Sequence, residues 1–253
     1  MKNIFRGTGV ALVTPFNNNG DIDFESLSKL VDHCIYGGVD FLVALGTTSE
    51  SATLSDSERN AVLSHIVEIN DNRLPILMGV GGNNTSLICS NINSVPKGIK
   101  GLLCVSPYYN KPTQEGIYQH FKEISISTNL PIVLYNVPGR TASNMTALTT
   151  LSLAKKFDNI VAIKEASGDL EQVMQIIKDA PDGFDILSGD DNLTFSIISL
   201  GAAGVISVSG QSFPNEFSAM VNHLLNGDLS LARSIHFRLF NYTKLIFREG
   251  NPG

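Results

Sequence analysis

The feature that most constrains the fold is a regular alternation of short apolar runs with longer amphipathic stretches along all 253 residues. Each run is almost continuously hydrophobic and is bounded by Gly, Pro, Asn or Asp, which is typical of strands covered on both faces of a parallel sheet. We therefore expect eight strands, at residues 9–14, 41–45, 75–80, 101–106, 131–137, 160–165, 184–188 and 204–208.

The intervening stretches have the period of amphipathic helices. Residues 24–36 and 57–69 each place their apolar side chains on one stripe. Ser55 and Glu58 have the spacing of a capping box that begins the second of these helices, and Gly37-Gly38 ends the first. After the last strand, two more helices are predicted at 214–225 and 229–246.

Eight strands joined by helices fit either an open doubly wound sheet or a closed (β/α)8 barrel. The strand count, the steady spacing and the lack of a G-x-G-x-x-G motif after the first strand favour the barrel. The glycine cluster at 79–82 is read as a strand-to-helix turn in preference to a phosphate loop. We expect residues 1–225 to form the barrel and residues 226–253 to begin a C-terminal helical region.

Composition excludes several classes of function. The net charge of −6 comes with no lysine and arginine cluster, which argues against nucleic-acid binding. The five histidines show no zinc-binding spacing, so no metal site is expected. Three cysteines without C-x-x-C pairing predict reduced core residues, and neither a signal-peptide core nor a membrane-length apolar run is present. We therefore expect a cytoplasmic protein.

Lys164 is the sharpest candidate for chemistry. In (β/α)8 barrels the active site lies at the carboxyl ends of the strands, and Lys164 follows the apolar run 160–163. Burial removes water from an ammonium group and favours the free amine, which attacks a ketone to form a Schiff base. The alternative is a lysine that extends from a strand end to solvent.

Other polar side chains follow strand ends. Tyr135 suits proton transfer, or packing with a satisfied hydroxyl. Thr47 and Thr48 suit carboxylate binding or hydrogen bonding within their own turn, and Arg140 suits a bidentate carboxylate contact or a solvated loop position. The pair at 190–191 is read as capping aspartates in preference to paired catalytic acids.

Four segments in order along the whole chain closely resemble the dihydrodipicolinate synthase family. They are GTTSESATL at 46–54, PYYNKP at 107–112, YNVPGRT at 135–141 and IKEA at 163–166. The resemblance implies a cofactor-independent condensation of pyruvate with L-aspartate-4-semialdehyde, the first committed step towards diaminopimelate and lysine.

The resemblance also implies a role for each matching residue. Lys164 forms the Schiff base with pyruvate, and Tyr135 beside it donates and accepts protons. Thr47 completes a hydroxyl relay with Tyr109, which a neighbouring subunit supplies in a homo-oligomer, a dimer of dimers. The remaining implied contacts are Thr48 and the backbone of Ile206 with pyruvate, and Arg140 with the carboxylate of the aldehyde.

The chain departs from the family pattern in three places. Ser49 stands where the family usually has glycine. The chain stops about forty residues before the usual end, so a trimmed C-terminal region is expected. The lysine-binding regulatory pocket maps to a set in which a leucine replaces the usual glutamate, so weak or absent inhibition by lysine is expected. Its members are Ser51, Ala52, Asp56, Arg59, Asn83, Leu87 and Tyr108.

Three other functions compete with this one. N-acetylneuraminate lyase and 2-keto-3-deoxy sugar-acid aldolases share the lysine and tyrosine, but Arg140 favours a carboxylate-bearing acceptor. A non-catalytic keto-acid-binding barrel has no need for the complete set Thr47, Tyr109, Tyr135 and Lys164. A phosphate-binding isomerase lacks a glycine-rich loop after the seventh strand, where SGDDN stands at 188–192.

Overall fold

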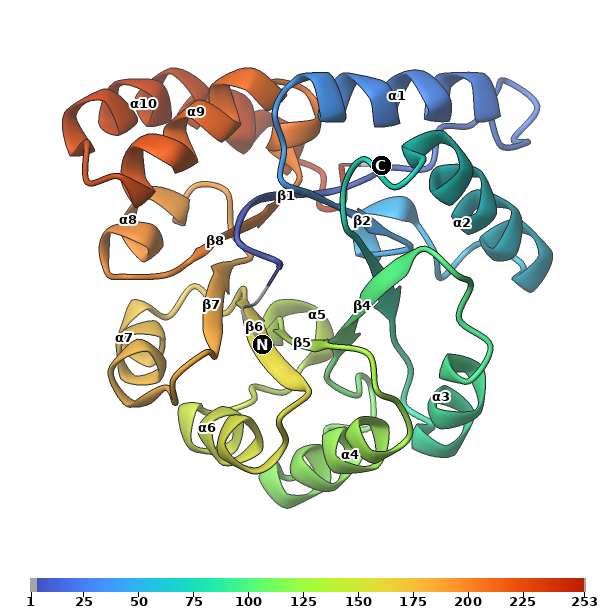
Figure 1. Ribbon diagram of the computed structural model, residues 1–253, viewed down its shortest axis with the longest axis vertical. Helices are drawn as coiled ribbons and strands as arrows, with labels where there is room; N and C mark the ends of the chain where they lie inside the picture. The colour runs from blue at the N-terminus through green and yellow to red at the C-terminus, as the bar shows by residue number, and fades with distance from the viewer. Residues whose placement is uncertain (1–3, 253) are drawn as a thin grey trace.

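The eight apolar runs form one closed parallel sheet in the computed structural model, which describes residues 4–252. Neighbours in sequence are neighbours in the sheet, and the last strand pairs with the first. A ring of helices surrounds the strands (Figure 1), so the predicted (β/α)8 barrel is confirmed. The strands are β1 (Gly7–Ala11), β2 (Phe41–Ala44), β3 (Ile76–Val80), β4 (Ile99–Val105), β5 (Ile132–Asn136), β6 (Ile160–Glu165), β7 (Asp185–Ser188) and β8 (Gly204–Ser207).

The first strand begins and ends earlier than the apolar run predicts. Gly7 and Thr8 already pair with β8, and the Thr8 N–H also donates to Asp40 Oδ2 at 2.7 Å. Beyond the strand, the Val13 N–H donates to the side chain of Gln211 at 3.0 Å. Hydrophobicity therefore continues past the last regular pairing of this strand.

The helices match the predicted positions closely. The stretches at 24–36, 214–225 and 229–246 are helical over those residues, and the second helix is one residue longer at each end than predicted. The Ser55–Glu58 capping box is present, and Gly38 takes the left-handed conformation after the first helix. The helices are α1 (Phe24–Tyr36), α2 (Asp56–Asn70), α3 (Thr85–Ile92), α4 (Gln114–Ile126), α5 (Pro138–Thr141), α6 (Ala147–Lys156), α7 (Leu170–Asp179), α8 (Thr194–Ser199), α9 (Pro214–Leu225) and α10 (Leu229–Ile246), with single 3-10 turns η1 (Thr47–Ser49) and η2 (Ser209–Gln211).

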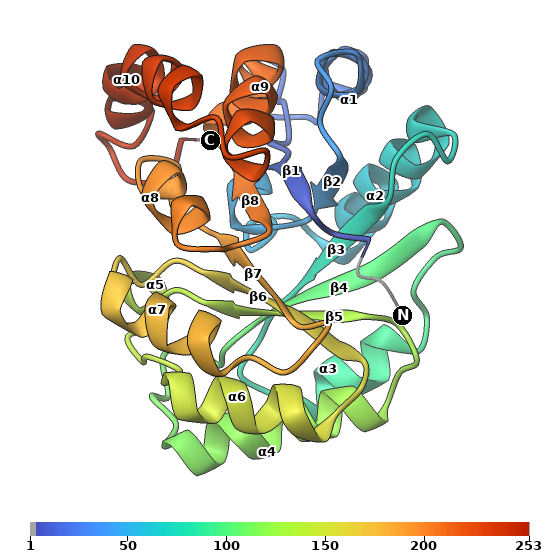
Figure 2. The ribbon, with the colours of Figure 1, turned by 60° about the vertical axis from the view of Figure 1, so that its left-hand side comes forward.

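The core has an inner and an outer layer. Alternate strand residues fill the barrel interior, and the residues between them pack against the helices. Phe5 joins the inner layer with no exposed surface, and its ring contacts Phe41 edge-on. Phe41 begins β2 and a Cβ at Gly101, early in β4, would meet the Phe5 ring, so Phe5 lies at the end where the strands begin. Figure 2 shows α5, which follows β5, at the opposite end of the barrel.

The last two helices extend the ring of helices. α10 packs against α9 and α8 beside β8 (Figure 1). Between residues 4 and 252, none of the helices has both the length and the apolar character needed to cross a lipid bilayer. The predicted division of the chain at residue 225 stays a prediction, and Gly253 lies outside the described residues.

Candidate active site

A cavity of about 390 Å³ opens at the carboxyl ends of the strands. This is the end at which (β/α)8 barrels place their active sites. Strand ends and the loops that follow them supply most of its wall, and α10 and the segment after it supply the rest. The polar side chains that line the cavity are Thr47, Thr48, Tyr135, Arg140, Lys164, Asp190, Asp191, Asn192, Thr243, Lys244 and Asn251.

Lys164 is buried in the wall of this cavity. Its exposed fraction is 6%, and it pairs in register with Tyr135 across β5 and β6. The Nζ atom lies 4.4 Å from the centroid of the Tyr135 ring. Among residues 4–252 no carboxylate forms an ion pair with this nitrogen. The lysine therefore faces the cavity and not bulk water.

A glycine makes room for the lysine. A Cβ atom at Gly189, just after β7, would lie 3.1 Å from Lys164 Cε and 2.7 Å from Ala166 Cβ. Both contacts are closer than side chains normally approach, so a larger residue would have to displace both neighbours. Gly189 thus helps to fix the path of the lysine side chain.

The Tyr135 hydroxyl is free to meet a ligand. The side chain is buried, and within the described chain its hydroxyl forms no hydrogen bond. Thr47 lines the same cavity but is exposed and shares no hydrogen bond with Tyr135. The structure brings these two predicted residues to one cavity without linking them directly.

Tyr109 is, with Ile206, one of the predicted active-site residues that the single chain leaves outside the cavity lining. It lies in the loop after β4 with 86% of its surface exposed. Its backbone is left-handed, with φ of 74°, which is unfavourable for an aromatic residue. A strained, exposed tyrosine at this end of the barrel is compatible with the expected contribution to a neighbouring subunit.

The turn that holds Thr47 and Thr48 is fixed at both ends. It forms η1, and the residues on either side, Leu45 and Glu50, have left-handed backbones with φ of 55°. Ser49, at the position where glycine was the expected residue, is buried and donates through its hydroxyl to Gly46 O at 2.7 Å. The turn thus accommodates the serine side chain, which adds a hydrogen bond to it.

Arg140 extends from the short helix α5 into the cavity lining. It is exposed, and no hydrogen bond or ion pair to the described residues occupies its guanidinium group. A guanidinium without a protein partner can bind a ligand carboxylate through two parallel hydrogen bonds. Ile206, by contrast, lies in the barrel interior below the cavity lining, which includes Val208 instead.

The two aspartates at 190–191 both bind backbone N–H groups. Asp190 Oδ1 accepts from Asn192 and Leu193 ahead of α8, as capping predicts. Asp191 Oδ2 accepts from Val208 and Ser209 at 3.1 and 2.7 Å, at the start of η2. Burial raises the pKa of Asp191, which the hydrogen bonds from Ser209 oppose. Asp191 therefore joins the ends of β7 and β8.

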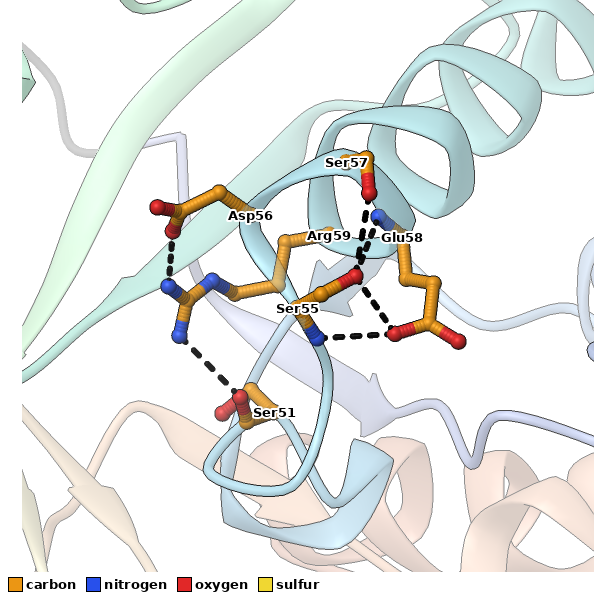
Figure 3. Close-up of polar contacts among 6 residues, drawn as sticks. All are labelled: Ser51, Ser55, Asp56, Ser57, Glu58 and Arg59. Carbon is orange, nitrogen blue, oxygen red and sulfur yellow. Dashed lines mark hydrogen bonds and ion pairs between the residues drawn. The ribbon is translucent and has the colours of Figure 1, made fainter.

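The expected regulatory set divides into two groups. Arg59 binds the Asp56 carboxylate and donates to Ser51 O at 3.3 Å, beside the Ser55–Glu58 capping box (Figure 3). Separately, Asn83 Nδ2 donates to Tyr108 O at 3.4 Å. Leu87 is 57% exposed and Ala52 is also exposed.

Sequence reasoning did not identify the part of the wall contributed by α10. Thr243, Lys244, Phe247 and Asn251 line the cavity far along the chain from any strand end. Within residues 4–252, no group of three or more His, Cys, Asp or Glu side chains is arranged to hold a metal ion.

Comparison with known proteins gives one consistent family. Residues 4–253 match the model of the Dihydrodipicolinate synthetase family. The 4-hydroxy-tetrahydrodipicolinate synthase of Azobacteroides pseudotrichonymphae is 53% identical over 250 residues, which cover 98% of this chain and 84% of that protein. Dihydrodipicolinate synthase from Thermotoga maritima superposes with a TM-score of 0.96 at 41% identity, covering 99% of this chain and 86% of that one. The pyruvate complex of the Acinetobacter baumannii enzyme gives a TM-score of 0.95 at 38% identity, covering 99% and 86%.

Proposed function

Because the chain belongs to the dihydrodipicolinate synthetase family, we propose that its cavity performs that family's reaction through an imine on Lys164. The activity is a lyase-class condensation of pyruvate with L-aspartate-4-semialdehyde on the route to diaminopimelate and lysine. The observation that supports the lysine most directly is its burial beside Tyr135, with no ion pair within the described chain.

The imine step follows from the placement of the amine. Lys164 Nζ attacks C2 of pyruvate, and the former keto oxygen leaves as water. The resulting iminium withdraws electrons from the methyl group, which loses a proton to give an enamine. The enamine carbon then attacks the aldehyde carbon of the second substrate, and the new alkoxide takes up a proton. Attack of the second substrate's own amine on C2 closes the ring and releases Lys164.

Each proton transfer in this sequence needs a group near Lys164. Tyr135 has its ring against the amine and its hydroxyl unoccupied by the described residues, so it is the proposed proton donor and acceptor. Thr47 lines the same cavity and is the proposed link in a hydroxyl relay. Tyr109 of a neighbouring subunit is the proposed outer member, which its exposure on the single chain supports.

The proposed substrate contacts come from side chains that line the cavity and from the end of β8. Arg140 takes the carboxylate of the aldehyde substrate. Thr48 and the backbone at Ile206 hold pyruvate below it, and pyruvate bound in the Acinetobacter baumannii relative supports a pyruvate site. The need for Tyr109 supports a homo-oligomer, proposed as a dimer of dimers that acts in the cytoplasm.

The proposed synthase differs from sugar-acid aldolases, which use the same imine chemistry, in the aldehyde that accepts the enamine. An unpaired arginine in the cavity favours an acceptor with a carboxylate near its aldehyde. Assays of pyruvate with L-aspartate-4-semialdehyde and with N-acetylmannosamine or a sugar aldehyde should show turnover with the first alone. Faster turnover of a sugar aldehyde would overturn the choice of acceptor.

Borohydride trapping tests the mechanism directly. Reduction in the presence of pyruvate should add one pyruvate-derived group to the chain, and peptide mass spectrometry should place it on Lys164. Lys164→Ala should show no adduct, whereas Lys155→Ala, which removes an exposed lysine on α6, should be trapped normally. An adduct on another lysine, or normal trapping in Lys164→Ala, would overturn the mechanism.

A further inference from the structure

The outer face of the β5–β6 strand pair carries a second set of polar residues behind the reactive pair. Tyr135 and Lys164 are register partners that face the cavity, and the next pair along the same strands is Asn136 and Glu165. Because successive strand residues point to opposite faces, this second pair points away from the cavity towards the helices. Both of its side chains are fully buried.

Glu165 accepts hydrogen bonds on both carboxylate oxygens. Asn136 Nδ2 lies 3.1 Å from each of them, the Ser167 N–H donates to Oε1 at 2.8 Å, and Gln172 Nε2 donates to Oε2 at 3.0 Å. Burial raises the pKa of Glu165, and these hydrogen bonds oppose that effect. A carboxylate is the one side chain of this size that accepts on both ends.

Asn144 closes the set into a ring. Asn136 Nδ2 also donates to Asn144 Oδ1 at 2.7 Å, and Asn144 Nδ2 donates to Gln172 Oε1 at 2.8 Å. We refer to Asn136, Asn144, Glu165 and Gln172 as the amide–carboxylate ring. It joins β5, β6, the loop that follows α5 and the start of α7.

Backbone groups determine the direction of every hydrogen bond in the ring. The Met145 N–H, which can only donate, contacts Asn136 Oδ1 at 2.9 Å, so the amide nitrogen of Asn136 must face Glu165. The Ser167 N–H likewise requires an acceptor at Glu165. The ring therefore tolerates one arrangement of donors and acceptors, and a neutral amide at 165 would place a donor against donors.

We infer that the amide–carboxylate ring is a positioning device that aims Lys164, Tyr135 and Arg140 at the cavity. Neither the Lys164 amine nor the Tyr135 hydroxyl has a hydrogen bond of its own within the described chain, so backbone and packing alone orient them. The ring holds the backbone immediately after both residues, and through Asn144 it holds the loop that follows Arg140. The inference rests on the proposed imine function.

Variants that exchange the carboxylate and amide groups test the ring. Glu165→Gln and Asn136→Asp each break its donor and acceptor pattern. The double variant Asn136→Asp, Glu165→Gln restores a consistent pattern within the ring: the new carboxylate accepts from the Met145 N–H and from the new amide, and the amides at 144 and 172 rotate to match. This rotation gives up the 3.3 Å contact of Gln172 Nε2 with the Met145 carbonyl oxygen. Asn159→Ala is the matched structural control. It removes a polar network at the opposite end of β6, where Asn159 binds Ser125 and Thr128.

The readout is the single-turnover rate of borohydride trapping with pyruvate, measured where circular dichroism shows each variant to be folded. We expect Glu165→Gln to be slower than wild type by about tenfold or more, because small displacements of a reacting group cost that much. The double variant should be trapped faster than either single variant. It also keeps the net charge of the wild type, which the single variants change. Asn159→Ala should lower the melting temperature and leave the trapping rate unchanged.

Asn144→Ala provides a test that does not depend on the folding of buried variants, since Asn144 is exposed. We expect the KM for the aldehyde to rise by about threefold or more, with a smaller change in pyruvate trapping, because Asn144 holds the loop next to Arg140. An unchanged KM would overturn the link to Arg140.

The outcomes separate the ring from the reaction itself. No trapping in the wild-type chain would overturn the imine function and the role of the ring with it. Normal wild-type trapping with an unchanged rate in folded Glu165→Gln, equal slowing in Asn159→Ala, or no recovery in the double variant would each overturn the ring alone.

Discussion

The two ends of the barrel solve opposite problems with the same eight strands. At the end where the strands begin, Phe5 fills the interior and the side chains around it are apolar. At the other end, the Tyr135 hydroxyl and the Arg140 guanidinium have no partner among residues 4–252. The non-glycine residues with left-handed backbones at that end are Leu45, Glu50, Tyr109, Lys111 and Ala142. None of these five residue types favours that conformation. The end where the strands begin therefore stabilises the fold, whereas the strained backbones and unpartnered polar groups at the cavity end lower its stability.

The comparison predicts the largest loss of activity, without loss of stability, at Lys164. Lys164→Met should lower kcat by about 10³-fold or more, because the covalent intermediate cannot form. The free energy of unfolding should stay the same or rise, since an apolar side chain replaces a buried amine. Steady-state kinetics and urea denaturation measure the two effects. A marked destabilisation would show that the lysine also supports the fold.

The opposite result is expected at the closed end. Phe5→Ala should lower the free energy of unfolding by about 3–5 kcal/mol, as for other fully buried phenylalanines. Its kcat should match wild type at temperatures where the variant is folded, because the ring lies at the far end from the cavity. The comparison between the ends fails if kcat falls at those temperatures.

Gly189→Ala tests how tightly the open end holds its lysine. The added methyl group would meet Lys164 Cε and Ala166 Cβ, so we expect the lysine to shift and kcat to fall by about 10²-fold. Gly139→Ala, whose Cβ meets no atom within 4 Å, is a matched control on α5 that should leave stability unchanged. A wild-type kcat in Gly189→Ala would show that the Lys164 side chain can shift without loss of activity.

A buried histidine places acid sensitivity away from both ends. Burial lowers the pKa of His120 on α4 to about 4, and its Nδ1 lies 2.7 Å from Thr85 Oγ1. The unfolded chain takes up this proton near pH 6.5 and the folded chain does not, so stability is full above pH 6.5 and falls as the pH drops towards 4. Between pH 7 and pH 5 this loss amounts to about 2 kcal/mol. In His120→Phe, the free energy of unfolding should fall less between pH 7 and pH 5 than it does in the wild type. The same pH dependence in both proteins would show that His120 is not the source of the acid sensitivity.

The smallest effect is expected from added lysine. Arg59 is already bound to Asp56 and to the Ser51 carbonyl, and the exposed side chain at Leu87 offers no carboxylate to an ammonium group. Millimolar lysine should therefore change the initial rate by less than about twofold. Leu87→Glu should increase the sensitivity if this position determines it. Strong inhibition of the wild-type chain would contradict the interpretation.

Strand-end reasoning located side chains that line the cavity, because barrel geometry carries every strand tip to one edge. Tyr135 and Lys164 lie near the ends of β5 and β6, Thr47, Thr48 and Arg140 follow strands, and all five line the cavity. Thr243, Lys244, Phe247 and Asn251 could not be found in this way. They reach the same cavity through the packing of α10 on α9 and α8, which no local pattern specifies.

The ring behind the lysine was equally hidden in the sequence. Asn136 and Glu165 are visible as polar residues at strand ends, but their outward direction depends on the register between β5 and β6. That register shifts between Ile132 and Val133, so counting along one strand does not locate the partner on the next. The sequence also did not show how the turn at Ser49 accommodates a serine in place of the expected glycine. In the structure the turn is kept, and the serine hydroxyl donates a hydrogen bond within it.

The burial of Phe5 inside the barrel also determines the end from which substrates approach Lys164. Because apolar side chains fill the interior at the end where Phe5 lies, substrates reach Lys164 through the cavity at the strand tips. In the proposed mechanism the keto acid binds before the aldehyde, because the enamine on Lys164 is the group that attacks the aldehyde carbon. We expect an aldehyde that binds to the free enzyme to obstruct the mouth of this cavity. Excess aldehyde should therefore slow turnover by competing with the keto acid.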